Sequence, residues 1–197
     1  MKIIACYCRA VLKTRLVYQA SVMFSVLGSI LAILAQMALW RYLYEGNEEQ
    51  TGYMLAYVVL ASIIGFVYYG NIAKDIEGRI RTGDLAMDLI KPASSLALFW
   101  GIAEGNVLAK LILQGIPILL VFSFTFAGRG IQPGGILLFV IALLMGHILF
   151  TLIYICLGYL AFVTIAVWPY LRLVNDTIRF LSGSVVPLSL IHISRGR

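Results

Sequence analysis

The chain has 197 residues, of which 61% are hydrophobic and 12% are charged, and its formal net charge is +6 at pH 7. A soluble domain of this length has too little interior for so much apolar material, so the composition excludes an ordinary soluble fold and indicates an integral membrane protein. The basic residues cluster beside apolar stretches, where anionic lipid and the positive-inside bias account for them, so nucleic acid is not expected as a partner.

Residues 1–15 predict an amphipathic helix at the membrane surface. On a helix that turns about 100° per residue, three basic residues share a narrow sector and three apolar residues lie opposite. The basic residues are Lys2, Arg9 and Lys13, and the apolar residues are Ile4, Tyr7 and Val11. We expect this segment to lie along the inner leaflet as an interfacial helix; the alternative is a frayed basic tail that only fixes the topology.

Apolar stretches predict about five membrane crossings, because a crossing helix needs about twenty mostly apolar residues. The first stretch, from Leu16 to Trp40, contains no charged residue. The others are residues 50–73, 111–128, one span within 130–171, and about 173–190. The expected fold class is therefore all-α, a polytopic transmembrane helical bundle that forms a single domain over residues 1–197.

The stretch 130–171 is too long for one crossing, yet two crossings would leave almost nothing for a turn. We predict one long span and a short re-entry, with the break at Trp168-Pro169, because proline disfavours a helical conformation in the residue before it. The alternative turn lies at Gly146-His147 and would give six crossings.

Basic residues alternate between the loops and predict the orientation. Four precede the first span, only Arg41 lies in the next loop, and four lie in the loop 71–95. The positive-inside bias then places the N-terminus and the loop 71–95 in the cytoplasm of a multi-pass cell-membrane protein. The loop 71–95 mixes both charge signs with apolar residues at near-helical spacing. This pattern fits short helices that seat in a partner's groove, and a solvated interfacial loop has the same pattern.

Two motifs resemble the permease subunits of type 2 ATP-binding-cassette (ABC) exporters. The run from Gly78 to Leu85, followed by Leu89-Ile90-Lys91-Pro92, resembles their cytoplasmic loop. The run from Phe180 to Leu188 resembles their small-residue-then-proline signature near the outer end of the fifth span. With the basic N-terminal helix and the order of the spans, the resemblance covers nearly the whole chain.

The resemblance implies a six-span permease that docks on a separate ABC ATPase subunit through its interfacial helix and first cytoplasmic loop. Two permease subunits, identical or different, and two ATPases then form one exporter, and the permease is neither an enzyme nor a holder of a cofactor. The coupling residues would be Ile76, Gly78, Arg79, Ile80, Arg81, Gly83, Asp84, Leu85, Lys91 and Pro92. The outer-end motif would be Ser182, Gly183 and Pro187. The family pattern continues with a sixth span after Leu188, so we expect the chain to be truncated at its C-terminus.

The sequence holds no catalytic or metal-binding motif that would point to an enzyme. His147 and His192 have no His, Cys or carboxylate neighbour at ligand spacing, so we expect His147 to serve helix packing or interfacial hydrogen bonding. The run from Gly65 to Gly70 lacks the Lys-Ser/Thr that follows a phosphate-binding loop. The transported substrate does not follow from these residues.

Ionisable residues in apolar stretches admit a second function. Asp176 and Arg179, at i,i+3 spacing, predict an intramembrane pair that is either a structural clamp or functional. Glu104 is either a proton-relay carboxylate or, with Lys110, a residue near the cytoplasmic interface. An ion-coupled secondary transporter would use Glu104 or Asp176 as its coupling carboxylate, although the chain shows no internal repeat.

Small residues at helical spacing predict close helix packing, within one permease or between two subunits. One ridge comprises Ser21, Ser25 and Ser29 with Gly28 and Ala32 beside them, and Gly101 and Gly105 form a second ridge at the start of the third span. Pro117 predicts a kink in that span, because it removes a backbone donor.

Overall fold

The computed structural model describes residues 2–68, 70–90, 94–126, 133–164 and 166–181. Within these residues the regular secondary structure is entirely helical, which confirms the all-α prediction. The chain forms two compact units, one made of Met1–Tyr69 and Ala93–Thr151 and the other of Gly70–Pro92 and Leu152–Arg197. The predicted outer-end motif and the loop residues Lys91 and Pro92 lie outside the described residues.

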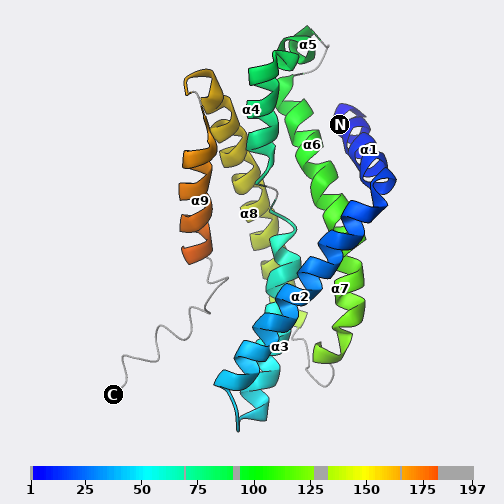
Figure 1. The fold of residues 1–197 in the computed structure, drawn as a ribbon, viewed down its shortest axis with the longest axis vertical. Helices are drawn as coiled ribbons and strands as arrows, with labels where there is room; N and C mark the ends of the chain where they lie inside the picture. The colour runs from blue at the N-terminus through cyan, green and yellow to red at the C-terminus, as the bar shows by residue number, and fades with distance from the viewer. Residues whose placement is uncertain (1, 69, 91–93, 127–132, 165, 182–197) are drawn as a thin grey trace. The chain divides into compact units, whose positions relative to one another are not determined.

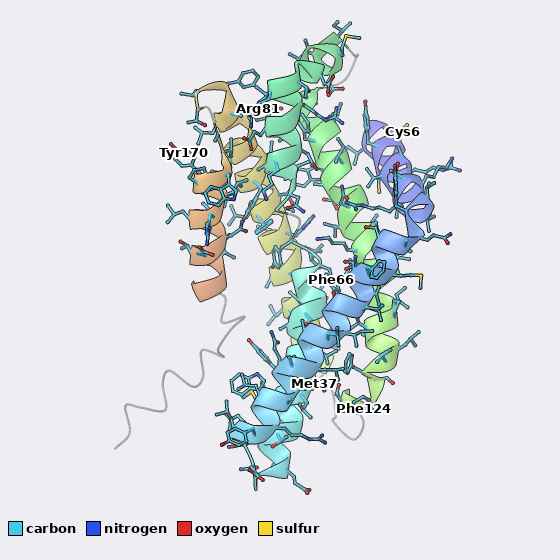
Figure 2. The ribbon with its side chains drawn as sticks, viewed as in Figure 1. Cys6, Met37, Phe66, Arg81, Phe124 and Tyr170 are labelled. Carbon is cyan, nitrogen blue, oxygen red and sulfur yellow. The ribbon has the colours of Figure 1, made fainter. Side chains whose placement is uncertain are left out.

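The first unit is built from helices that pack in pairs (Figure 1). Helix α1 (Lys2–Val17) lies along α6 (Ser95–Lys110), and α2 (Gln19–Leu43) lies against α3 (Glu48–Gly65). After α6 the chain continues through a π-helical turn, η1 (Leu111–Gly115), into α7 (Ile116–Val121) and a 3₁₀ turn, η2 (Ser123–Phe126). Met37, which is labelled in Figure 2, is one of the buried residues of α2.

Three helical stretches of the described residues are long and apolar enough to cross a bilayer, namely Gln19–Leu43, Ser95–Val121 and Ile136–Phe162. The first and third correspond to predicted spans. The second corrects the predicted third span, which was placed at 111–128. Its helix begins at Ser95, after Ser94, whose side chain accepts a hydrogen bond from the Ala97 N–H as an N-cap. Helix α1 covers this part of α6, so the polar residues there are compatible with a continuous helix.

The second predicted span, 50–73, is too long by several residues. Helix α3 ends at Gly65, and a turn over residues 66–68 precedes α4 (Ile72–Thr82). With its polar first turn, α3 is not among the three candidate spans. Of the predicted span 173–190, only the part within α9 (Trp168–Leu181) is described.

The predicted kink at Pro117 takes the form of a π-helical turn. Pro117 lies in the first turn of α7, directly after η1. Proline lacks an N–H, and its ring clashes with the carbonyl four residues earlier, so the regular hydrogen-bond ladder is disturbed at this point.

Helix α8 (Pro133–Tyr159) decides between the two layouts of the stretch 130–171. It runs without interruption through Gly146 and His147, so the alternative turn at these residues is wrong. The helix ends in a 3₁₀ turn, η3 (Leu160–Phe162), and α9 begins at Trp168. The break therefore lies just before the predicted Trp168-Pro169, because proline is tolerated in the first turn of a helix and here starts α9.

The second unit contains α4, α5 (Asp84–Ile90), the end of α8 with η3, and α9. Gly158 on α8 allows α4 to approach closely, because a Cβ there would lie 2.8 Å from the Cβ of Ile76. The Tyr154 hydroxyl on α8 donates a hydrogen bond to Oδ1 of Asn175 on α9. Ile76 and Tyr154 are fully buried, so this small core holds α4 against the α8–α9 pair.

Candidate functional site

The predicted coupling loop is a pair of short helices, which we call the coupling hairpin (residues 72–90). Helix α4 ends at Gly83, whose φ of 81° lies in the left-handed region that suits a residue without a Cβ. The Gly83 N–H donates to the carbonyl of Ile80, and α5 begins at the next residue. The Thr82 hydroxyl donates to Asp84 Oδ2 at 2.7 Å, which secures the turn.

An ion pair between a partly exposed arginine and a buried aspartate joins the two helices of the hairpin. Arg79 Nη1 on α4 donates to Asp88 Oδ2 on α5, and the Asp88 side chain is only 3% exposed. A buried carboxylate without a partner is costly, so the pair holds α5 in one position against α4. Leu85 is also buried, so Arg79 and Leu85, both predicted coupling residues, stabilise the hairpin itself. Asp88 had no place in the predicted set.

Helix α5 carries apolar side chains that the second unit does not cover. Met87 is 65% exposed, Leu89 is 62% exposed and Ile90 is 77% exposed. Neighbouring apolar side chains that the fold leaves exposed are a feature of interaction surfaces. We call Met87, Leu89 and Ile90 the exposed α5 surface.

Glu77 connects the hairpin to the turn before α9. Its Oε1 accepts a hydrogen bond from the Val167 backbone N–H at 3.4 Å and lies 3.7 Å from Nη1 of Arg81. Arg81, labelled in Figure 2, is largely exposed, in contrast to Arg79. The remaining predicted residues Ile76, Gly78 and Ile80 lie on α4, where Ile76 is buried and Gly78 is exposed.

A second set of polar groups lies in the first unit, and we call it the polar cluster (Val67, Glu104 and His147). The Nδ1 atom of His147 lies 2.9 Å from the Val67 carbonyl oxygen, and its Nε2 atom lies 2.8 Å from Glu104 Oε1. The His147 side chain is 8% exposed and that of Glu104 is 27% exposed. Sequence spacing gave no sign of this pair, because the fold brings Glu104 to His147 from another helix.

Helix α1 packs on α6, the helix that carries Glu104. A Cβ on Gly101 would lie 3.1 Å from the Tyr7 Cβ, and one on Gly105 would lie 2.8 Å from the Val11 Cβ. The predicted Gly101 and Gly105 ridge therefore receives the apolar side of α1 rather than another span. This contact also agrees with the predicted amphipathic pattern of residues 1–15.

Polar contacts add to this interface. Arg15 donates to Asn106 Oδ1 from Nη2 at 2.8 Å and from Nε at 3.2 Å. Burial and the nearby Glu104 carboxylate both raise the pKa of the Cys8 thiol on α1, with burial the larger cause. Cys8 is thus a neutral thiol at physiological pH.

The predicted pair of Asp176 and Arg179 is described only in part. Asp176 is exposed on α9, and its Oδ2 lies 4.0 Å from Nε of Arg172. The Arg172 guanidinium lies 5.4 Å from the centre of the Trp168 ring. The side chain of Arg179 lies outside the described residues, so that pair stays a prediction.

Within the part of the chain that the structure describes, no group of three or more His, Cys, Asp or Glu side chains could hold a metal ion. Residues 30–193 match the family model described as ABC-2 family transporter protein. No match to the chain was found among curated proteins or among solved structures.

Proposed function

Because the chain belongs to the ABC-2 family of transporter membrane proteins, we propose that it is the permease subunit of an exporter whose ATP is hydrolysed by a separate subunit. The observation that supports this function best is the coupling hairpin. It presents apolar side chains on α5 while Arg79 pairs with the buried Asp88 and holds that helix in place.

The exposed α5 surface has the features of a docking element. A partner that covers Met87, Leu89 and Ile90 removes apolar area from water, which contributes about 25 cal/mol per Å². The short hairpin is braced internally, so little conformational entropy is lost when it binds. The ATPase subunit is the partner that the family membership supplies.

In the proposed mechanism, closure of two ATPase subunits pushes on the coupling hairpin of each of two permeases. The spans then change between two arrangements, and nucleotide biases the equilibrium between them. In this proposal the hairpin and the N-terminus face the cytoplasm. The chain crosses the membrane about five times, with α3 and the predicted stretch 173–190 adding to the three candidate spans.

The second permease subunit has a candidate contact surface on α2. A Cβ on Gly28 would meet no atom within 4 Å, and Ser21 and Ser25 beside it are exposed. Packing within the described residues does not use this ridge, and close contact between small residues stabilises helix pairs in lipid. This favours the subunit-interface interpretation over packing within one permease.

The docking proposal is tested by placing a charge on the exposed α5 surface. Met87→Asp and Ile90→Asp should each lower recovery of the ATPase in a pull-down from membranes by tenfold or more, because an unpaired carboxylate would be desolvated at the contact. Lys74→Asp is the matched control, since it places the same carboxylate at an exposed position on α4. Membrane insertion should be unchanged in all three variants.

Retention of the ATPase by both α5 variants, with transport-coupled hydrolysis intact, would contradict the docking role of the hairpin. In that case the ion-coupled secondary transporter is the better interpretation. The polar cluster is the specific observation in its favour, because Glu104 and His147 together can hold a proton between candidate spans.

A further inference from the structure

The hydrogen bonds of His147 determine how many protons the polar cluster holds. The Val67 carbonyl oxygen can only accept, so the Nδ1 atom of His147, 2.9 Å away, carries a hydrogen. The 2.8 Å contact between Nε2 and Glu104 Oε1 then contains one further hydrogen, on the ring or on the carboxyl group. The first case is an imidazolium with a carboxylate, and the second is a neutral imidazole with a carboxylic acid.

Both cases have the same proton count and zero net charge. A pair without net charge is the least costly form in which two ionisable groups are buried. If the shared proton were lost, two lone pairs would face each other at the Nε2–Oε1 contact. The closed contact therefore requires its proton.

The cluster joins three segments that are distant in the sequence. Val67 follows α3, Glu104 lies on α6, and His147 lies on α8. Around it, a Cβ on Gly146 would lie 3.1 Å from the Tyr68 hydroxyl, and the Tyr68 ring contacts the Phe150 ring edge-on with centroids 5.0 Å apart. One turn of α8 is thus tied to the residues after α3 by packing and by the cluster.

Two of the points at which the chain passes from the first unit into the second lie beside this cluster. Tyr69 is the last residue of the first unit after α3, and Thr151 is its last residue on α8. Val67 and His147 stand two and four residues before these points. The coupling hairpin belongs to the second unit, and two of the places where the chain enters that unit lie within four residues of the cluster along the sequence.

We propose that Glu104 and His147 form a one-proton latch that ties α8 to α6 and to the end of α3, and that this latch opens and releases its proton during the transport cycle. The inference rests on the proposed transport function. Separated in water at pH 8, the two groups are a carboxylate and a neutral imidazole, so opening releases one proton. One linked proton changes the ratio of closed to open latch by at most tenfold per pH unit, and the closed form is favoured as the pH falls toward about 6.5.

The other charged and titratable groups near the latch do not account for the proton that Glu104 and His147 share. On α1, Cys8 is the group that interacts with Glu104, and its raised pKa keeps it a neutral thiol. Tyr68 stands beside α8 and contacts Phe150 through its ring. Arg15 and Lys110 are cations that repel each other, and Arg15 donates to Asn106. Within this set Glu104 and His147 are the two groups that share a proton across a hydrogen bond.

The chain contains two histidines, so ¹⁵N-histidine NMR of the full chain in lipid vesicles can observe the latch directly. Replacing His192 by Gln assigns the signals. We expect Nδ1 of His147 to be protonated across pH 6–8.5 and its Nε2 signal to change with pH. In Glu104→Gln the amide donates to Nε2, so the contact persists without a titrating proton, and the Nε2 signal should not change with pH.

Transport by the assembled exporter is the second measurement. The wild-type rate should depend on pH between 6 and 8.5, by up to tenfold per unit, and Glu104→Gln should remove that dependence. Glu45→Gln, the same change at an exposed residue between α2 and α3, should keep the wild-type profile. An unprotonated Nδ1, or a Glu104→Gln profile equal to the wild type with the ATPase bound, would overturn the latch. ATPase binding by the α5 variants is measured separately, so failure of the docking proposal can be distinguished from failure of the latch.

Discussion

The coupling hairpin and the polar cluster each join helices through one acidic and one basic side chain. They differ in the basic side chain, which is an arginine in the hairpin and a histidine in the cluster. In the hairpin, Arg79 pairs with Asp88 nine residues away, and a guanidinium remains charged at every physiological pH. In the cluster, His147 pairs with Glu104 forty-three residues away, and an imidazole gains or loses its charge near neutrality. The first pair is suited to a permanent brace and the second to a contact that opens.

The largest expected effect breaks the permanent brace. Arg79→Met removes the guanidinium that pairs with the buried Asp88 carboxylate, and breaking a pair of this kind typically costs about 3 kcal/mol. We expect the thermal midpoint of the purified protein to fall by about 6–12 °C at pH 6 and at pH 8.5 alike. Differential scanning fluorimetry in detergent measures this change.

Arg81→Met is the matched control for that prediction. Nη1 of Arg81 lies 3.7 Å from Oε1 of Glu77, and the Arg81 side chain is largely exposed. The free energy of unfolding should therefore fall by at most about 1 kcal/mol. An equal drop for both variants would show that the Arg79–Asp88 pair is not the brace of the hairpin.

An intermediate effect is expected where glycines allow close approach in each unit. Gly105→Ala would place a Cβ 2.8 Å from the Val11 Cβ and 3.0 Å from the Cys8 backbone, and Gly158→Ala would place one 2.8 Å from the Ile76 Cβ. Each should cost about 1–3 kcal/mol through overpacking, measured as a lower thermal midpoint. Gly105→Ala should also disturb the polar cluster through α6, so its thermal midpoint should fall further at pH 6 than at pH 8.5. The fall in thermal midpoint for Gly158→Ala should not vary with pH.

Gly28→Ala serves as the control for both glycine variants. A Cβ there meets nothing within 4 Å, so the thermal midpoint of the isolated chain should stay the same or rise slightly. A drop as large as that of Gly105→Ala would show that the close contacts of Gly105 and Gly158 are not what makes those positions sensitive.

The smallest expected effect is a difference in thiol reactivity on α1. Burial and the Glu104 carboxylate raise the pKa of the Cys8 thiol, and the thiolate is the reactive form. Cys8 should therefore react with a membrane-permeant maleimide several-fold more slowly than the exposed Cys6 at pH 7.5, and its rate should keep rising as the pH passes about 9. Quenched labelling followed by mass spectrometry measures both rates, and Glu104→Gln should raise the Cys8 rate. Equal rates for Cys6 and Cys8 would contradict the close contact of α1 with α6.

Local patterns were sufficient for the features that depend on near neighbours in the chain. The uncharged run from Leu16 to Trp40, the irregular helix at Pro117 and the helix start at Trp168-Pro169 follow from hydropathy and proline chemistry. The order of the two loop and tail motifs correctly indicated the ABC-2 family. The start of the third span at Ser95 was missed, because charge counting treats Glu104 and Lys110 as a boundary although α1 covers that part of α6.

By itself the sequence determined that this protein is a helical membrane protein, because apolar content, helix length and proline position act locally and need no knowledge of partners. Only the tertiary structure decided which polar groups meet. It paired Glu104 with His147 rather than leaving either alone, it joined Arg79 to the buried Asp88, and it buried Leu85. The physical reason is that a hydrogen bond requires two atoms within about 3 Å, and for residues forty-three positions apart helix packing sets that distance rather than any spacing along the chain.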